Sequence, residues 1–269
     1  MRWLHMQLEE RRRGRHSGEM LSAGFVEDVR VVLPVRGVPE HVERLPDGKT
    51  TVVLRTLDDG TGDVWILGPR TRALFKTATG VARAVTVALQ PGWTMAVLGI
   101  PASALVDQHV SLDELWGRAG AELRDELLAM HDPSAVALRL DDVFAARVRR
   151  VGGSSSARLA RCAVQLLEHD VDRVEEVAAD LGVTARHLRR VFVESVGIGP
   201  KEFARCVRLQ RAVRGASASA SDWGRVAAEA GYYDQAHLIA DFHDLVGVTP
   251  GAYARRAVAR KRCDHARAS

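Results

Sequence analysis

Arg186, Arg189 and Arg190 lie close together in the segment TARHLRRVFVESVG. If this segment is a helix, spacings of three and four residues place the guanidinium groups on one face. A guanidinium group can donate hydrogen bonds to O6 and N7 of guanine, or bind a phosphate. The opposing interpretation is a solvated basic helix face with no ligand, and for an isolated arginine triplet that interpretation is the better one.

A second segment repeats the pattern around these arginines. VAADLG at 177–182 aligns with VAAEAG at 226–231, and a helical segment with a closing glycine follows each of them. The aligned positions further along are His187 with His237, Leu188 with Leu238, Phe192 with Phe242, Gly197 with Gly247, Pro200 with Pro250 and Phe203 with Tyr253. Each copy predicts a short helix, a glycine turn, a second helix, a glycine stop and a capped third helix.

Apolar spacing predicts which face of the second helix is buried in each copy. The inward-facing residues are Leu188, Val191 and Phe192 in the first copy, and Leu238, Phe242 and Leu245 in the second. The glycine turn leaves the outer face free, as reading of the DNA major groove requires. We therefore expect two helix-turn-helix units, at about 174–197 and 222–247. Within such a unit, Arg186, Arg189 and Arg190 are better interpreted as residues that contact DNA.

The segment AAEAGYYDQAHLIADFHDLVGVTPGAYAR resembles the C-terminal signature of AraC/XylS-type transcription regulators. The match covers about 156–258 and is strongest in Gly-aromatic-x-Asp-Gln-x-His and in Gly-x-Thr-Pro. The resemblance implies a seven-helix domain in which a long helix, here about 200–214, joins two helix-turn-helix units. It also implies a sequence-specific regulator whose two recognition helices enter successive major grooves of double-stranded operator DNA, with RNA polymerase as a further candidate partner.

The expected DNA-binding residues differ between the two units. In the first unit they are Thr184, as the helix cap, Arg186, His187, Arg189 and Arg190. In the second unit they are Gln235, Ala236, His237, Ile239, Ala240 and His243. The arginine positions of the first unit correspond to alanines and an isoleucine in the second, although the family often has a basic residue where Ala240 stands. Such apolar side chains suit thymine methyl groups.

This difference predicts an asymmetric reader, in which the first helix discriminates between sequences and the second mainly positions the protein. His187 and His237 are equally well interpreted as structural residues, each bonding nearby backbone. Tyr232 and Tyr233 are expected to pack or hydrogen-bond at the turn rather than contact bases. Four arginines on the connecting helix are candidates for the DNA backbone, although a solvated face is the better interpretation for at least two of them: Arg205, Arg208, Arg211 and Arg214.

The first half of the chain predicts strands followed by helices. Segments rich in β-branched residues at 29–35, 50–57, 63–68, 82–90 and 94–100 alternate with turn sequences. Helical periodicity follows to about residue 150, and VGGSSS at 151–156 is the expected linker. The whole chain thus predicts an α+β fold: a loose extension at 1–20, a barrel-like or sandwich-like sensor domain at 21–150, an all-α DNA-binding domain at 157–260 and a tail at 261–269.

Composition places limits on partners and location. The net charge of +4 arises entirely after residue 153, which agrees with a polyanion bound by the second half only. No apolar run is long enough for a membrane helix, and the start lacks a secretory signal, with Met20 as an alternative start. Three cysteines, none in a CxxC motif, favour a reducing cytoplasm over a disulfide scaffold or a zinc knuckle.

A sensor domain predicts an unknown small-molecule effector or a homodimer, without a fixed cofactor. Trp65 and Trp93 are pocket candidates, although core filling is the better interpretation, and the helices within 112–150 suit either dimerisation or packing on the strands. The sequence has no HxH or HExxH metal motif.

Two rival functions remain. A repair-type enzyme fused to a DNA-binding module needs a reactive cysteine, and the first half has none; GxSxG and phosphate-loop motifs are absent as well, so no enzyme is expected. A non-specific nucleic-acid binder is disfavoured by the low net charge and by the lack of aromatic stacking platforms.

Overall fold

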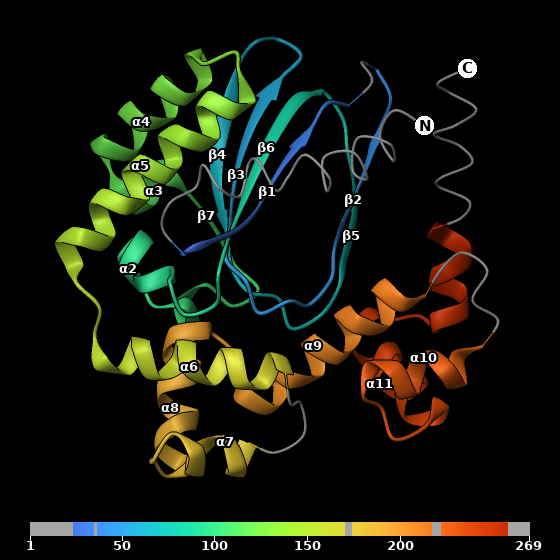
Figure 1. Ribbon diagram of the computed structural model, residues 1–269. Coiled ribbons are helices and arrows are strands. Elements are labelled where there is room, and N and C mark those ends of the chain that lie inside the picture. The colour runs from blue at the N-terminus through green and yellow to red at the C-terminus, as the bar shows by residue number, and fades with distance from the viewer. Residues whose placement is uncertain (1–23, 35–36, 170–173, 217–221, 258–269) are drawn as a thin grey trace. The chain divides into compact units, whose positions relative to one another are not determined.

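The computed structural model describes residues 24–34, 37–169, 174–216 and 222–257 (Figure 1). The expected extension at 1–20 and tail at 261–269 lie outside the described residues. The chain divides into two compact units, one of which ends at Val207 and the other of which continues from Arg208. The compact unit that ends at Val207 contains both the β-rich region and the first helix-turn-helix. The division therefore does not coincide with the linker expected at 151–156, and the domain boundaries stay a prediction.

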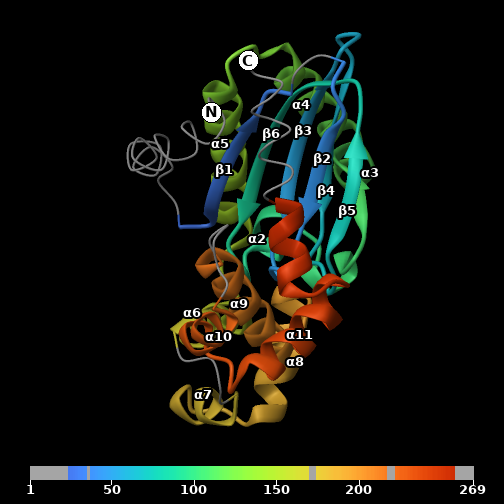
Figure 2. The same cartoon turned by 90° about the vertical axis from the view of Figure 1, so that its right-hand side faces the viewer.

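The β-rich region consists of two antiparallel sheets. The larger has the strand order β1-β6-β3-β4-β7, and β2 pairs with β5 in the smaller (Figure 2). The strands are β1 (Val26–Val32), β2 (Glu40–Arg44), β3 (Thr51–Leu57), β4 (Gly62–Leu67), β5 (Leu74–Ala78), β6 (Val81–Leu89) and β7 (His109–Ser111). Four of the strands expected from β-branched segments are present, whereas β2, β5 and β7 were not expected. These three are short, and β7 is paired with β4 alone.

One face of the larger sheet forms the core of this region. Buried residues alternate along β3 and β4, as a half-buried strand requires. The helices that cover this face are α4 (Arg118–Ala129) and α5 (Pro133–Val151) (Figure 1). Leu127, Leu140 and Phe144 of these helices pack against Leu54 and Ile66 of the sheet. Strands followed by helices confirm the α+β class.

One expectation for the first half is wrong. The segment TMAVLGI, expected to be a strand, forms helix α2 (Thr94–Leu98), which ends at Gly99. A short apolar run fits a buried helix as well as a strand, and methionine, alanine and leucine favour the helix. Within the helical stretch that follows Ser111, Gly117 separates α3 (Leu112–Trp116) from α4. A short 3-10 helix, η1 (Ala102–Leu105), follows α2.

The second half is helical, as expected. Its helices are α6 (Ser155–His169), α7 (Val174–Asp180), α8 (Ala185–Val196), α9 (Pro200–Gly215), α10 (Trp223–Ala230) and α11 (Gln235–Val246), and residues 250–257 are also helical. Among the described residues, no helix has the length and apolar character that a membrane crossing needs.

Candidate nucleic-acid interface

The first helix-turn-helix is built from α7, the turn at Gly182 and α8. Gly182 has φ of 66°, and backbone hydrogen bonds of 2.9 Å from Gly182 N to Ala179 O and from Val183 N to Ala178 O close the turn. Leu188 and Phe192 are fully buried, and their core includes residues of α6 and α9. The apolar face of α8 is therefore held inward, which leaves the opposite face exposed.

Thr184 caps α8, as expected. Its Oγ1 accepts a hydrogen bond from the backbone N–H of His187 over 3.2 Å. A threonine cap satisfies one of the free N–H groups at the start of a helix, and the remaining ones point along the axis, where a phosphate binds favourably.

Removal of this cap is expected to destabilise the first unit. Thr184→Ala leaves the His187 amide without its acceptor and should lower the free energy of unfolding by about 1 kcal/mol, measured by urea denaturation. Thr184→Ser keeps a hydroxyl and is the control. A loss of the same size in the serine variant would show that the hydroxyl is not the stabilising group.

The three arginines of α8 are all exposed but differ in their partners. Arg189 donates to the Glu175 carboxylate over 2.8 Å, and Arg190 lies 3.3 Å from Nδ1 of His187. Within the described residues, Arg186 makes no such contact. Arg186 is thus the arginine whose donors stay available, whereas Arg189 is held in an exposed ion pair with Glu175.

The second helix-turn-helix, made of α10, the turn at Gly231 and α11, closes in the same way. Tyr232 N donates to Ala227 O over 2.9 Å, and Asp234 caps α11 by accepting from His237 N over 2.7 Å. His237 Nδ1 lies 3.5 Å from the Tyr233 N–H, and its ring lies edge-on to Tyr232 at 5.2 Å. These contacts favour the structural interpretation of His237, while its exposure leaves a DNA contact open.

From the sequence SDWGRVAAEAG, Ser221 is the expected cap of α10, and the observed cap differs from it in detail. Asp222 is the capping residue and accepts from Arg225 N over 3.0 Å, one position after the expected Ser221, which lies outside the described residues.

The outer face of α11 carries no lysine or arginine. The candidates Gln235, Ala236, Ile239, Ala240 and His243 are all exposed, so the structure gathers them on one face as expected. The adjacent Asp241 is buried and is not part of this exposed face. The outer face of α11 therefore lacks the arginines that the outer face of α8 carries.

Two aromatic residues at the second turn have opposite environments. Tyr232 is 5% exposed and packs in the core of the second unit, as expected. Tyr233 is 93% exposed and does not pack at the turn, but its backbone N–H donates to His237 Nδ1 there over 3.5 Å, which is the hydrogen-bonding alternative of the expectation. The reason is geometric, because neighbouring residues at a turn point in different directions and only one can enter the core.

The connecting helix contributes at least one structural arginine. Arg208 is buried, and its guanidinium group lies 5.6 Å from the centre of the Tyr232 ring. Arg208 therefore supports the turn of the second unit instead of facing solvent.

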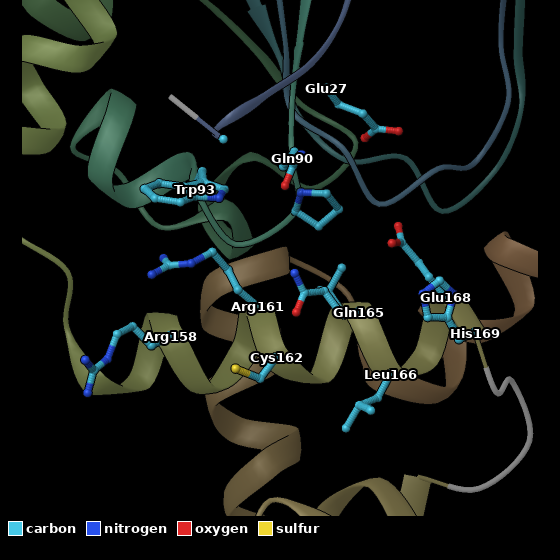
Figure 3. A pocket seen from close by; sticks show the side chains of 13 residues that line it. Glu27, Gln90, Trp93, Arg158, Arg161, Cys162, Gln165, Leu166, Glu168 and His169 are labelled. Carbon is cyan, nitrogen blue, oxygen red and sulfur yellow. The ribbon is translucent and has the colours of Figure 1, made fainter. Parts of the chain in front are cut away.

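A cleft of about 830 Å³ lies between the β-rich region and α6 (Figure 3). Gln90 and Trp93 line it from one side, and Arg161 and Gln165 point toward them from α6. Trp93 is half-buried, lies edge-on to Phe25 at 6.0 Å and has the Arg161 guanidinium 4.1 Å above its ring. The described residues contain no cluster of three or more metal-ligating side chains.

Comparison with known proteins supports the helix-turn-helix interpretation. Residues 177–256 match a family model described as a helix-turn-helix domain, while no curated protein matches the chain. Solved structures of ToxT from Vibrio cholerae are similar at 10% identity with a TM-score of 0.45, covering 84% of this chain and 97% of ToxT in one crystal form. A ToxT structure with unsaturated fatty acid bound has a TM-score of 0.42 at 10% identity and covers 86% and 91% of the two chains. The family match over residues 177–256 agrees with the two matched units, so this part of the chain is a helix-turn-helix domain.

Proposed function

We propose that this chain is a transcription regulator that binds a specific double-stranded DNA site through the outer faces of α8 and α11. The observation that carries the proposal is the exposed arginine face of α8, held outward by a buried apolar face within a matched pair of helix-turn-helix units. In such units the second helix enters the major groove and its side chains read base edges. Successive grooves on one face of the duplex are the expected sites for the two helices.

The decisive experiment is selection of bound DNA from a random pool by the full-length protein. A single recurrent motif with two half-sites about one helical turn apart supports the proposal. Uniform binding of all sequences, with a steep salt dependence, would instead identify a non-specific nucleic-acid binder.

The chemistry of the two faces predicts half-sites of different composition. Arginine recognises guanine, glutamine recognises adenine, and isoleucine and alanine pack against the thymine methyl group. The half-site of α8 is therefore expected to be rich in G·C pairs, and that of α11 in A·T pairs. Discrimination should be stronger at the α8 half-site, because α8 carries exposed arginines that can form paired hydrogen bonds with a base and α11 carries no arginine.

An arginine added to the outer face of α11 should introduce a charged contact with a DNA phosphate. Ala240→Arg is expected to raise affinity several-fold at low salt and to make the slope of log K against log salt steeper by about one unit. Fluorescence anisotropy over a range of salt concentrations measures both effects. Ala119→Arg on α4 adds the same charge at an exposed position of the β-rich region. An equal change in slope for that control would attribute the effect to net charge alone.

The β-rich region is proposed to modulate DNA binding in response to a small molecule or to a second copy of the chain. The cleft beside Trp93 has the size of ordinary ligand pockets and includes α6, which packs against the reading helix α8. RNA polymerase is the proposed protein partner, and the cytoplasm is the proposed location.

A further inference from the structure

The core of the first helix-turn-helix includes a residue from the β-rich region. Val106, directly after η1, packs against the apolar cluster that contains Leu188, Phe192 and Val196 of α8. Every other member of this cluster lies in the C-terminal half of the chain, from Ala163 onward. The first DNA-reading unit and the β-rich region belong to one compact unit, so this packing is part of a single fold.

The end of α8 lies against two loops of the β-rich region. Gly197 ends α8 with φ of 94° and is buried. A Cβ at this position would lie 3.0 Å from Ala102 O, 3.0 Å from Pro69 Cγ and 3.1 Å from Val106 Cγ2. Backbone of the β-rich region thus approaches α8 so closely that only glycine fits without displacement.

The loop that carries Val106 is held rigidly from behind. Asp107 has φ of 55°, a conformation that residues other than glycine seldom adopt. Its carboxylate accepts hydrogen bonds from the Thr71 N–H over 3.1 Å and from the Thr71 hydroxyl over 2.5 Å, and its own N–H donates to Pro69 O over 2.8 Å. An unfavourable backbone conformation persists only where its surroundings enforce it. The Thr71–Asp107 contact therefore fixes where Val106 meets α8.

Two further contacts join the β-rich region to the helices around the first helix-turn-helix. A Cβ on Gly48, in the loop between β2 and β3, would lie 2.7 Å from Phe203 Cδ2, so this loop also touches the α9 side of the cluster. On α6, Arg161 stacks on Trp93 and its Nη1 donates to Gly92 O over 3.5 Å (Figure 3). Burial lowers the pKa of the Arg161 guanidinium, as expected for a cation enclosed by this contact.

The second helix-turn-helix offers an internal control for these contacts. Gly247 aligns with Gly197 and also has positive φ, 79°, but no atom of the described residues lies within 4 Å of a Cβ built there, and the residue is exposed. The apolar cluster of the second unit contains residues of the C-terminal half alone. The two helix-turn-helix units share a local sequence pattern, but among the described residues a member of the β-rich region, Val106, packs only against the apolar cluster of the first.

We propose that Val106 is a positioning residue that fixes the orientation of α8 for base reading. Val106 lies on the turn that the Thr71–Asp107 contact holds in place. The β-rich region thereby takes part in DNA reading by the first helix-turn-helix unit. Base readout depends on placing a guanidinium group within hydrogen-bond distance of base edges, and a small rotation of α8 ends it. Phosphate contacts tolerate such a shift better, because the backbone is present in every sequence. Loss of the contact should therefore reduce sequence discrimination before it reduces binding as such.

The test uses full-length Val106→Ala, Gly197→Ala and Gly247→Ala on the DNA site selected by the wild-type protein. The discrimination ratio, affinity for the selected site divided by affinity for a site mutated in the α8 half, is the readout. We expect Val106→Ala and Gly197→Ala to lower this ratio at least tenfold with the salt slope unchanged. Gly247→Ala introduces a similar positive-φ alanine without a contact to lose and should keep the ratio within about twofold.

A variant distant from the apolar cluster separates positioning from general damage. Thr71→Val removes the hydroxyl that binds Asp107 and leaves every side chain of the cluster intact. We expect it to lower the discrimination ratio several-fold while circular dichroism and the unfolding midpoint stay near wild type.

Either of two results would overturn the inference: wild-type discrimination in Val106→Ala and Thr71→Val, or equal losses in Gly197→Ala and Gly247→Ala. The inference rests on the proposed DNA function, and the two fail differently. If the wild-type protein selects no motif, the proposed function is wrong; if it selects one that all the variants read normally, only the positioning role is wrong.

Discussion

Arg186→Ala is expected to lower the affinity of the full-length protein for its selected DNA site by about 10- to 100-fold, since a good arginine–guanine pair contributes about 1–3 kcal/mol. Among the arginines of α8, Arg186 is the one that makes no ion pair or hydrogen bond with other described residues. Arg189→Ala should have a smaller effect, because binding through Arg189 first breaks its contact with Glu175.

Fluorescence anisotropy with the selected duplex measures these losses, and each variant is also tested on duplexes changed at single base pairs. Arg186→Ala should relax discrimination at one guanine and leave the rest of the site unchanged. Arg118→Ala is the matched control, since it removes an exposed, ion-paired arginine from α4. If Arg186→Ala binds like the wild type while Gln235→Ala abolishes binding, α11 is the main reader and the proposed asymmetry is reversed.

Phe192→Ala should produce the largest loss of stability among single substitutions in the first unit. The ring is fully buried and lies edge-on to Phe203 at 5.5 Å, and removal of a buried phenylalanine side chain costs about 3–5 kcal/mol. Phe242, at the aligned position of the second unit, is also buried and lies edge-on to Tyr253 at 5.4 Å. Phe242→Ala is therefore expected to cost a similar amount, but in a different part of the chain.

Hydrogen exchange measured by mass spectrometry distinguishes the two variants. Because the first helix-turn-helix shares a compact unit with the β-rich region, Phe192→Ala should accelerate exchange in α8 and also in the η1–β7 turn. Phe242→Ala should accelerate exchange in α10 and α11 and leave the β-rich region unchanged. Uniform acceleration across the chain in both variants would mean that the protein unfolds as one cooperative body, against the division into two units.

Local sequence determined the two helix-turn-helix units. A glycine turn, apolar residues at spacings of three and four, and polar caps such as Thr184 act within a few residues of one another, so they are legible in the sequence alone. The same holds for the gathering of the candidate residues on the outer faces of α8 and α11. The family match over 177–256 agrees with that local pattern.

Short apolar and weakly patterned segments were beyond sequence reasoning. TMAVLGI suits a strand or a buried helix equally, and only packing decides that it forms α2. Strands β2 and β5 form because they pair with each other, with Arg44 opposite Leu74 and Glu40 opposite Ala78, and no local signal reports such a distant partner.

Tertiary structure alone decided how the side chains are used. It separated Arg186 from the ion-paired Arg189, and it buried Tyr232 while exposing Tyr233. It also placed Val106 against α8, far from it in sequence. Helix caps and apolar periodicity are properties of neighbouring residues, so the sequence alone specified helices α8 and α11. Ion pairs, burial and packing between elements arise only when distant segments meet, so only the tertiary structure specified what holds these helices in place.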